Sequence, residues 1–78
     1  MARIIDGEKK NITGARIRQL RKAQGLSQQD LSARLETLAI YVCRGSISRI
    51  EDGSRMVTDI ELYGFSQVLN TPIEDFFI

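Results

Sequence analysis

The stretch from Leu26 to Gly53, LSQQDLSARLETLAIYVCRGSISRIEDG, constrains the fold of this chain more than any other. Ser27 is a good helix-capping residue, and the leucines that follow it recur at the spacing of one helical stripe. Residues 44–52 show a second amphipathic pattern, with Ile47 and Ile50 on the inward side. Two helices that bury one shared seam leave an outer face free, and the partner of that face decides the function. The predicted stripe of the first of these helices consists of Leu31, Leu35 and Leu38.

Length and composition argue against an enzyme. A chain of 78 residues forms one domain with room for a small hydrophobic core but not for an enclosed active site. The sequence has no histidine and one cysteine, so it lacks zinc-ligand clusters and histidine-assisted nucleophiles. We therefore expect no catalytic activity and no cofactor.

Cysteine usage and hydropathy indicate the compartment. The lone Cys43 cannot form an internal disulfide, and the sequence shows neither a secretory leader nor a long apolar run. We expect a soluble cytoplasmic protein without membrane contact.

Charge is distributed unevenly along the chain, although the net charge is only +1. Residues 1–34 carry a net charge of +5 and residues 35–78 carry −4. A chain with this polarity can place a basic face against a polyanion while an acidic face points to solvent. The simpler interpretation of the same pattern is that these charged side chains are only exposed to solvent and bind no polyanion.

A helix is expected before the central stretch. It should start near Asn11 or Thr13, either of which can cap free N–H groups, and run to Gln24. Gly25 can adopt the left-handed conformation, and Leu26 can fold back onto the last turn, which together favour a Schellman-type end.

The segment between the two central helices is the least regular part of the sequence. Residues 39–43, AIYVC, are apolar and lack the glycine of a tight helix–helix turn. We interpret them as an extended end of the second helix followed by a loop that packs on the core or on a second subunit. The third helix then covers residues 44–52 and ends at Gly53. Cys43 is expected to be a small, partly buried packing residue rather than a redox switch.

Two capping boxes mark the C-terminal helices. Thr58 and Glu61 can satisfy each other's backbone N–H groups, which starts a fourth helix that reaches about Leu69. A second box at residues 71–74 adds proline at the first helical position and starts a short fifth helix.

These elements predict an all-α fold, a compact domain of five helices over residues 13–78. Residues 1–12 form an N-terminal arm, which is either frayed or a short strand.

The order of these segments supports a family resemblance. RIRQLRKAQGLSQQDLSARL is followed by SISRIEDG, then by a capped helix and LNTPIEDFF. Over roughly residues 13–77 this order resembles the Cro/C1-type helix-turn-helix domains of phage repressors and small bacterial regulators. The resemblance implies a lambda-repressor-like fold in which the third helix lies in the DNA major groove and the second begins at the phosphate backbone.

The resemblance also implies roles for individual residues. Positions that contact bases are occupied here by Arg44, Ser46, Ser48 and Arg49, and an arginine can pair with two acceptors of one guanine. Gly45 leaves one usual contact position without a side chain.

Five other residues are given roles at the DNA backbone or inside the domain. Gln28 at the start of the second helix, Arg55 just past the third and Lys10 on the arm can each contact a phosphate. Arg21 and Glu51 match positions that form an internal ion pair in relatives, and we expect them to pair and fix the angle of the third helix.

One segment departs from the family pattern. Residues 38–43 make the connection before the third helix roughly five residues longer than the usual short turn. Cys43 falls at the N-cap position but caps poorly compared with serine or threonine. The first turn of the third helix is therefore expected at Arg44 or Ser46.

The leading hypothesis is a sequence-specific transcriptional regulator, such as a repressor, that binds double-stranded DNA. We expect a homodimer on a near-palindromic operator, because a single helix contacts too few base pairs for useful specificity. The alternative is a protein-interaction module, antitoxin-like or an adaptor, whose apolar loop or C-terminal residues 76–78 bind a protein partner.

Overall fold

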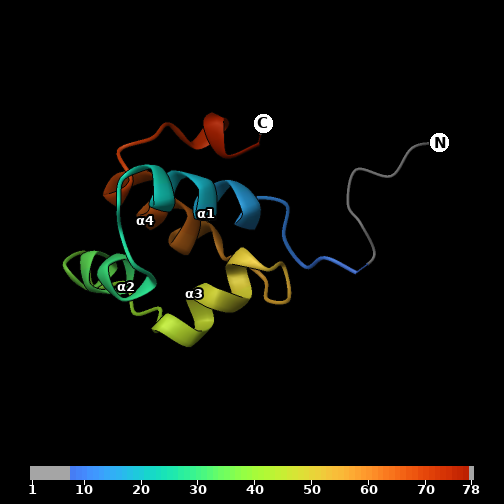
Figure 1. Ribbon diagram of the computed structural model, residues 1–78, viewed down its shortest axis with the longest axis horizontal. Coiled ribbons are helices and arrows are strands. Elements are labelled where there is room, and N and C mark those ends of the chain that lie inside the picture. The colour runs from blue at the N-terminus through green and yellow to red at the C-terminus, as the bar shows by residue number, and fades with distance from the viewer. Residues whose placement is uncertain (1–7, 78) are drawn as a thin grey trace.

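The computed structural model describes residues 8–77, which form four α-helices and one 3-10 helix (Figure 1). The elements are α1 (Gly14–Ala23), α2 (Gln28–Glu36), α3 (Arg44–Glu51), α4 (Asp59–Val68) and the 3-10 helix η1 (Ile73–Phe77). α3 packs against α1 and α2, while η1 packs against α1 and α4. The all-α fold class is therefore confirmed. Most of the expected arm over residues 1–12 lies outside the described residues.

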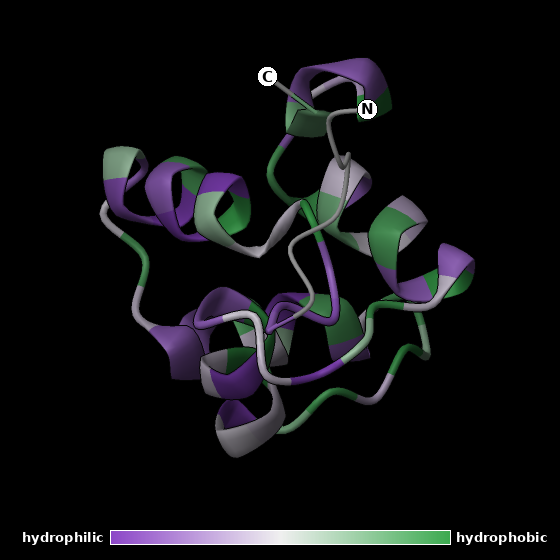
Figure 2. Cartoon of the chain, turned by 90° about the vertical axis from the view of Figure 1, so that its right-hand side faces the viewer, coloured by the Kyte–Doolittle hydropathy of each residue, from purple (hydrophilic) through white to green (hydrophobic). Residues whose placement is uncertain are grey.

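The hydrophobic core lies where the apolar faces of the helices meet. Figure 2 shows hydrophobic and hydrophilic residues alternating along the helices, the amphipathic pattern that a small helical domain needs to bury one side of each element. Burying one large aliphatic or aromatic side chain stabilises the fold by roughly 1.5–3 kcal/mol. The buried hydrophobic residues are Ile17, Leu31, Leu35, Val42, Ile47, Ile50, Phe65, Leu69 and Phe76.

Two helices begin with a capping box: the box at α4 was predicted, whereas at α2 the sequence predicted only the Ser27 cap. The Ser27 hydroxyl accepts from the Asp30 N–H at 2.9 Å, and the Asp30 carboxylate accepts from the Ser27 N–H at 2.9 Å. Thr58 and Glu61 make the same reciprocal pair at the start of α4, at 3.1 and 3.0 Å. α1 differs, because Thr13 makes no side-chain cap bond and the Asn11 Oδ1 accepts from the first helical N–H instead, at 2.7 Å.

Glycines end α1 and α3 as predicted. Gly25 has φ +70° and Gly53 has φ +85°, both in the left-handed region that side chains disfavour. At the end of α1 the Leu26 N–H donates to the Arg21 carbonyl oxygen at 3.1 Å, which is the bond that defines a Schellman motif.

α2 ends earlier than the leucine stripe predicts. Ala39 adopts φ +59°, and the Ile40 N–H donates to the Leu35 carbonyl oxygen at 3.1 Å, so the chain turns away as if Ala39 were a terminating glycine. The helix itself stops at Glu36. The assignment of Leu38 to the buried stripe was wrong, because its side chain lies past this turn and is 43% exposed.

The connection from α2 to α3 is extended and alternates between buried and exposed residues. Ile40 packs against the core and Val42 is buried. The Val42 carbonyl oxygen accepts from the Ser32 hydroxyl at 2.8 Å, which ties the connection to α2. Tyr41 lies between these two anchors and is 77% exposed. The expected packing on the core therefore holds for Ile40 and Val42 but not for Tyr41.

The last helix is a 3-10 helix rather than an α-helix opened by a capping box. The Thr71 hydroxyl donates to the Leu69 carbonyl oxygen at 2.9 Å, and the Asp75 N–H donates to the Pro72 carbonyl oxygen at 3.0 Å. The second of these bonds spans three residues, as in a 3-10 turn. Phe76 nevertheless reaches the core. No helix within residues 8–77 is long and apolar enough to cross a membrane.

Candidate nucleic-acid interface

α3 presents a polar face to solvent while its opposite side is buried. The helix begins at Arg44, the first of the two predicted starts, and Ile47 and Ile50 anchor it in the core. The same eight-residue helix therefore provides both the apolar side chains that hold it in the core and a polar surface that faces solvent. The outward side chains are those of Arg44, Ser46, Ser48 and Arg49, of which Ser46 is half-buried and the others are exposed.

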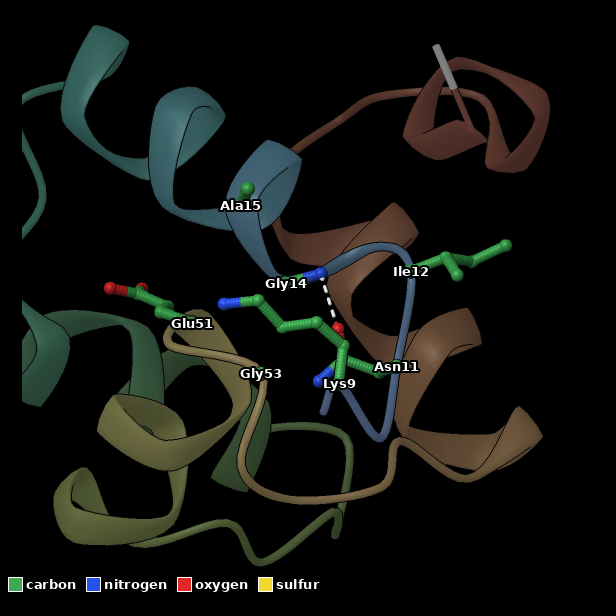
Figure 3. A pocket seen from close by; sticks show the side chains of 7 residues that line it. All are labelled: Lys9, Asn11, Ile12, Gly14, Ala15, Glu51 and Gly53. Atoms are coloured by element: carbon green, nitrogen blue, oxygen red, sulfur yellow. Dashed lines mark hydrogen bonds between the residues drawn. The ribbon is translucent and has the colours of Figure 1, made fainter. Parts of the chain in front are cut away.

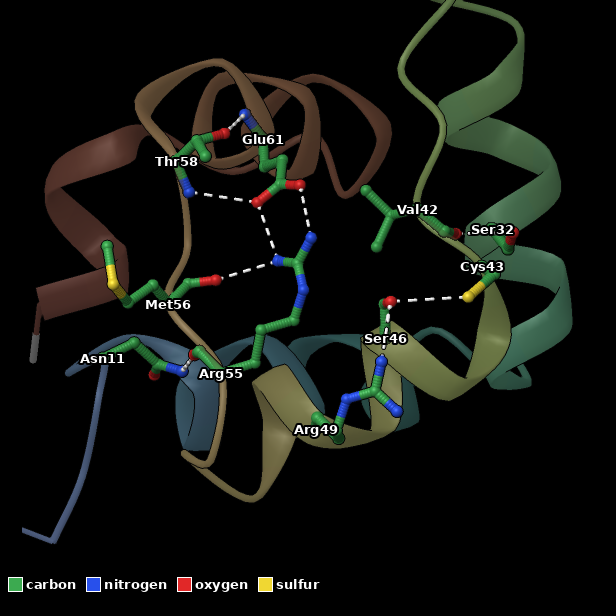
Figure 4. A network of polar contacts seen from close by, with 10 residues as sticks. All are labelled: Asn11, Ser32, Val42, Cys43, Ser46, Arg49, Arg55, Met56, Thr58 and Glu61. Atoms are coloured by element: carbon green, nitrogen blue, oxygen red, sulfur yellow. Dashed lines mark hydrogen bonds and ion pairs between the residues drawn. The ribbon is translucent and has the colours of Figure 1, made fainter.

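A short polar network covers the first turn of α3 (Figure 4). The Ser46 hydroxyl accepts from Arg49 Nη2 at 3.2 Å and lies 3.4 Å from Cys43 Sγ. Hydrogen bonding to Ser46 lowers the pKa of the Cys43 thiol from its ordinary value. Cys43 is exposed and makes no side-chain cap bond, so the expectation of a partly buried packing residue was wrong. Its side chain points into the network because the preceding Val42 occupies the buried position.

Arg21 and Glu51 join α1 to α3 through a two-pronged ion pair. Arg21 Nε lies 2.7 Å from Glu51 Oε2, Arg21 Nη2 lies 3.0 Å from Oε1, and the two side chains are only 9% and 3% exposed. This is the pair that the sequence predicts. Arg21 also donates to the Leu26 carbonyl oxygen at 2.7 Å, and its hydrogen bonds to Glu51 raise its pKa further. Gln28 Nε2 donates to Glu51 Oε1 at 3.1 Å, so the same carboxylate fixes α3 against both neighbouring helices.

An open hollow of about 310 Å³ lies where α1, the start of α2 and α3 meet. Gln28 lines it, and its amide nitrogen carries a second hydrogen beyond the one directed at Glu51. Ser48 lines it from α3, and Arg18 lines it from α1 with an exposed side chain. Asp52 adds a negative charge, and its bonds from Ser54 lower its pKa.

Arg55 is engaged inside the domain. Its Nη1 and Nη2 lie 3.0 and 2.9 Å from the two oxygens of Glu61, and Nη1 also donates to the Met56 carbonyl oxygen at 2.8 Å (Figure 4). Hydrogen bonding to Arg55 lowers the pKa of Glu61, and the same pairing raises that of Arg55. The predicted phosphate contact of Arg55 stays a prediction, and it would have to share a guanidinium that Glu61 already holds.

The described part of the arm lies against the C-terminal end of α3. The Lys10 N–H donates to the Gly53 carbonyl oxygen at 2.8 Å, and Lys9 Nζ donates to the Asp52 carbonyl oxygen at 2.9 Å. Asn11 Nδ2 donates to two carbonyl oxygens at and beyond the end of α3, at 3.0 and 2.8 Å. Figure 3 shows Lys9, Asn11 and Gly53 bordering a pocket between the arm and the end of α3. The backbone of Lys10 is thus fixed while its side chain is exposed.

The fold, the polar outer face of α3 and the adjoining start of α2 agree with one family. A model described as helix-turn-helix matches residues 17–76, more than half of the chain. The chain belongs to the helix-turn-helix family. This helix-turn-helix chain is also similar to a solved structure, the restriction-modification controller protein C.AhdI from Aeromonas hydrophila. The two share 28% sequence identity with a TM-score of 0.73, over 83% of this chain and 91% of that one. No curated protein matches the chain.

The family match and the fold together confirm the resemblance to Cro/C1-type helix-turn-helix domains. The helix-turn-helix chain is a DNA-binding transcription regulator of the Cro/C1 type and not an enzyme.

Arg18 is the residue at this surface that the sequence-based assignment missed. It lies three residues before Arg21, so on a helix both share one side. The expected pairing of Arg21 with Glu51 could therefore have placed Arg18 beside α3. Its position beside Gln28 also depends on how α1 packs against α2 and α3, which spacing along the chain does not give.

Proposed function

We propose that this regulator binds a near-palindromic DNA operator as a homodimer, with α3 of each copy in a major groove. The observation that supports this most is the pairing of Glu51 with Arg21 and Gln28, which holds α3 rigidly while its polar face stays outward. A rigid helix of fixed orientation is what a base-contacting element requires.

The base contacts are assigned to the outward residues of α3. Arg44 is exposed at the first turn and suits a bidentate contact with guanine. Arg49 bonds to Ser46 in the free protein and would exchange that neutral partner for a guanine acceptor. Ser46 and Ser48 can donate to either bases or phosphates.

The backbone contacts are assigned to residues that flank α3. Gln28 has a free amide hydrogen at the start of α2, where the helix dipole also attracts a phosphate. Lys10 presents an exposed ammonium group beside the end of α3. Arg55 remains assigned to this group as the sequence predicts, and we add Arg18, which lines the same hollow as Gln28.

Homodimer formation is supported by apolar surface on and after α4. Ile60 is 66% exposed, Tyr63 is 56% exposed and Phe77 is 51% exposed. A second copy that covered these side chains would remove them from water, which favours association. The same surface would serve the second candidate function, a protein-interaction module, if the partner were a different protein.

Selection of bound duplexes from a random pool tests the proposal. We expect an enriched two-fold symmetric site whose half-sites lie about 34–36 Å apart or at a multiple of that spacing. Affinity for the selected duplex should fall steeply with salt, because phosphate contacts release counterions. An asymmetric site bound by one copy would contradict the homodimer. Failure to enrich any duplex at low salt would favour the protein-interaction module.

A further inference from the structure

Tyr41 exposes a larger fraction of its surface than any other large hydrophobic residue within residues 8–77. Its side chain is 77% exposed, whereas Met56 and Ile60, the next most exposed, reach 66%. Such exposure leaves a large ring in water without any gain in core packing, so the fold itself does not explain it.

The backbone that carries Tyr41 is held on both sides. The Ile40 N–H donates to the Leu35 carbonyl oxygen at 3.1 Å, and the Val42 carbonyl oxygen accepts from Ser32 at 2.8 Å. Ile40 and Val42 also pack inward, so the extended backbone turns Tyr41 outward. The ring is therefore displayed at a fixed place rather than on a loose loop.

That place adjoins the proposed DNA-binding end of α3. Tyr41 lines an open hollow of about 370 Å³ together with Gln29 from the first turn of α2 and Arg44 from the first turn of α3. These two helix starts are the parts of a helix-turn-helix unit that approach the duplex. A duplex that reached both would pass over Tyr41.

We propose that Tyr41 contacts the DNA backbone beside the major groove that α3 enters. The ring would pack against a deoxyribose, and the phenol hydroxyl would donate to a phosphate oxygen. This proposal rests on the proposed function, because it requires α3 to face DNA.

The charges around the hollow favour DNA as the occupant near its α3 end. Arg44 supplies a positive charge there, and Gln29 belongs to the first turn of α2, where the helix dipole is positive. Glu36 lines the same hollow but lies seven residues after Gln29, roughly 10 Å farther along α2. A phosphate is therefore attracted toward Arg44 and away from Glu36.

The test compares Tyr41→Ala and Tyr41→Phe with the parent, using the duplex selected from a random pool on the parent protein. Tyr41→Ala should weaken binding about tenfold and Tyr41→Phe about threefold, because the first loses both ring and hydroxyl. An unrelated duplex should show similar factors, since backbone contacts carry no sequence information. The phenol is uncharged, so the salt dependence should keep its slope.

Leu38→Ala is the matched control, because Leu38 is an exposed apolar residue of the same connection that does not line the hollow. It should bind as the parent does. Equal weakening in both alanine variants would overturn the proposal, as would parental binding by Tyr41→Ala when Arg44→Ala is weakened. Parental binding by Arg44→Ala would instead overturn the proposed function itself. Weakened binding that accompanies loss of self-association in Tyr41→Ala would also overturn the proposal and place Tyr41 between copies of the chain.

Discussion

At the scale of single residues, two glycines face opposite environments. A Cβ on Gly14 would lie 1.9 Å from the Ile50 carbonyl oxygen, so α1 and α3 cross where only a glycine fits. A Cβ on Gly45 would meet only the Arg49 guanidinium, at 3.9 Å. The first glycine is required by packing, whereas the second leaves room on the outer face of α3.

We predict that Gly14→Ala destabilises the protein by about 3 kcal/mol, because the backbone of α3 must move to admit the methyl group. Urea unfolding measures this change. Gly45→Ala is the control and should raise stability by up to about 1 kcal/mol, because alanine favours a helix more than glycine. Equal stability changes for the two variants would contradict the packing difference between the sites.

Ala39 carries a backbone conformation that disfavours its side chain. Its φ of +59° lies in the left-handed region, which costs a non-glycine residue about 1–2 kcal/mol. Ala39→Gly should therefore raise the free energy of unfolding by about 1 kcal/mol, after the entropy that glycine gains in the unfolded chain. Thermal unfolding reports the change. If Ala39→Gly instead lowered the free energy of unfolding, the Ala39 methyl group would make a contact that stabilises the fold by more than the backbone strain costs.

At the scale of elements, sequence reasoning succeeded where helix boundaries depend on local chemistry. The capping residues Ser27 and Thr58 and the terminating Gly25 act on backbone groups within a few residues of themselves, so their effects were visible in the sequence. Ala39 defeated the same reasoning, since alanine has no preference for the left-handed region and tertiary packing of Ile40 and Val42 decides the turn. That error also put Leu38 on the wrong surface.

The ion pair between α1 and α3 is expected to dominate the stability of the interface. Arg21→Ala should lower the free energy of unfolding by about 3 kcal/mol, because it leaves the Glu51 carboxylate buried without its charged partner. Chemical denaturation checks the value. In the double variant with Glu51→Ala the loss should be smaller than the sum of the two single losses. Unchanged stability combined with weaker DNA binding would make Arg21 a phosphate contact instead.

The pair between Arg55 and Glu61 predicts a pH-dependent contribution at the start of α4. Its hydrogen bonds lower the pKa of Glu61 in the folded state, so the stabilisation is present above the ordinary glutamate pKa of about 4.3. It is lost as pH falls through the lowered value. Glu61→Gln should therefore be less stable than the parent at pH 7, and the difference should shrink in acid. Denaturation at several pH values tests this, and a difference that stayed constant would contradict it.

At the scale of the whole molecule, the sequence predicted the order of helices and the outward position of the α3 residues. It did not predict which distant groups share a surface. Arg18 lines one hollow with Gln28 and Ser48 only because α1 packs across the C-terminal half of α3, and Arg55 pairs with Glu61 across the turn between α3 and α4. Such contacts depend on helix crossing geometry, which local spacing does not encode.

The central claim is that α3 contacts bases, and the binding of Arg44→Ala to a set of duplexes tests it most directly. The set contains the selected site and single base-pair changes at every position, with Arg34→Ala as a control that removes an equal charge from an exposed position on α2. We predict that Arg44→Ala loses about 1–3 kcal/mol of binding free energy per contact and no longer discriminates at one position of each half-site. Arg34→Ala should keep full discrimination. A parental discrimination profile for Arg44→Ala at every position would contradict the assignment of α3 as the base-contacting helix.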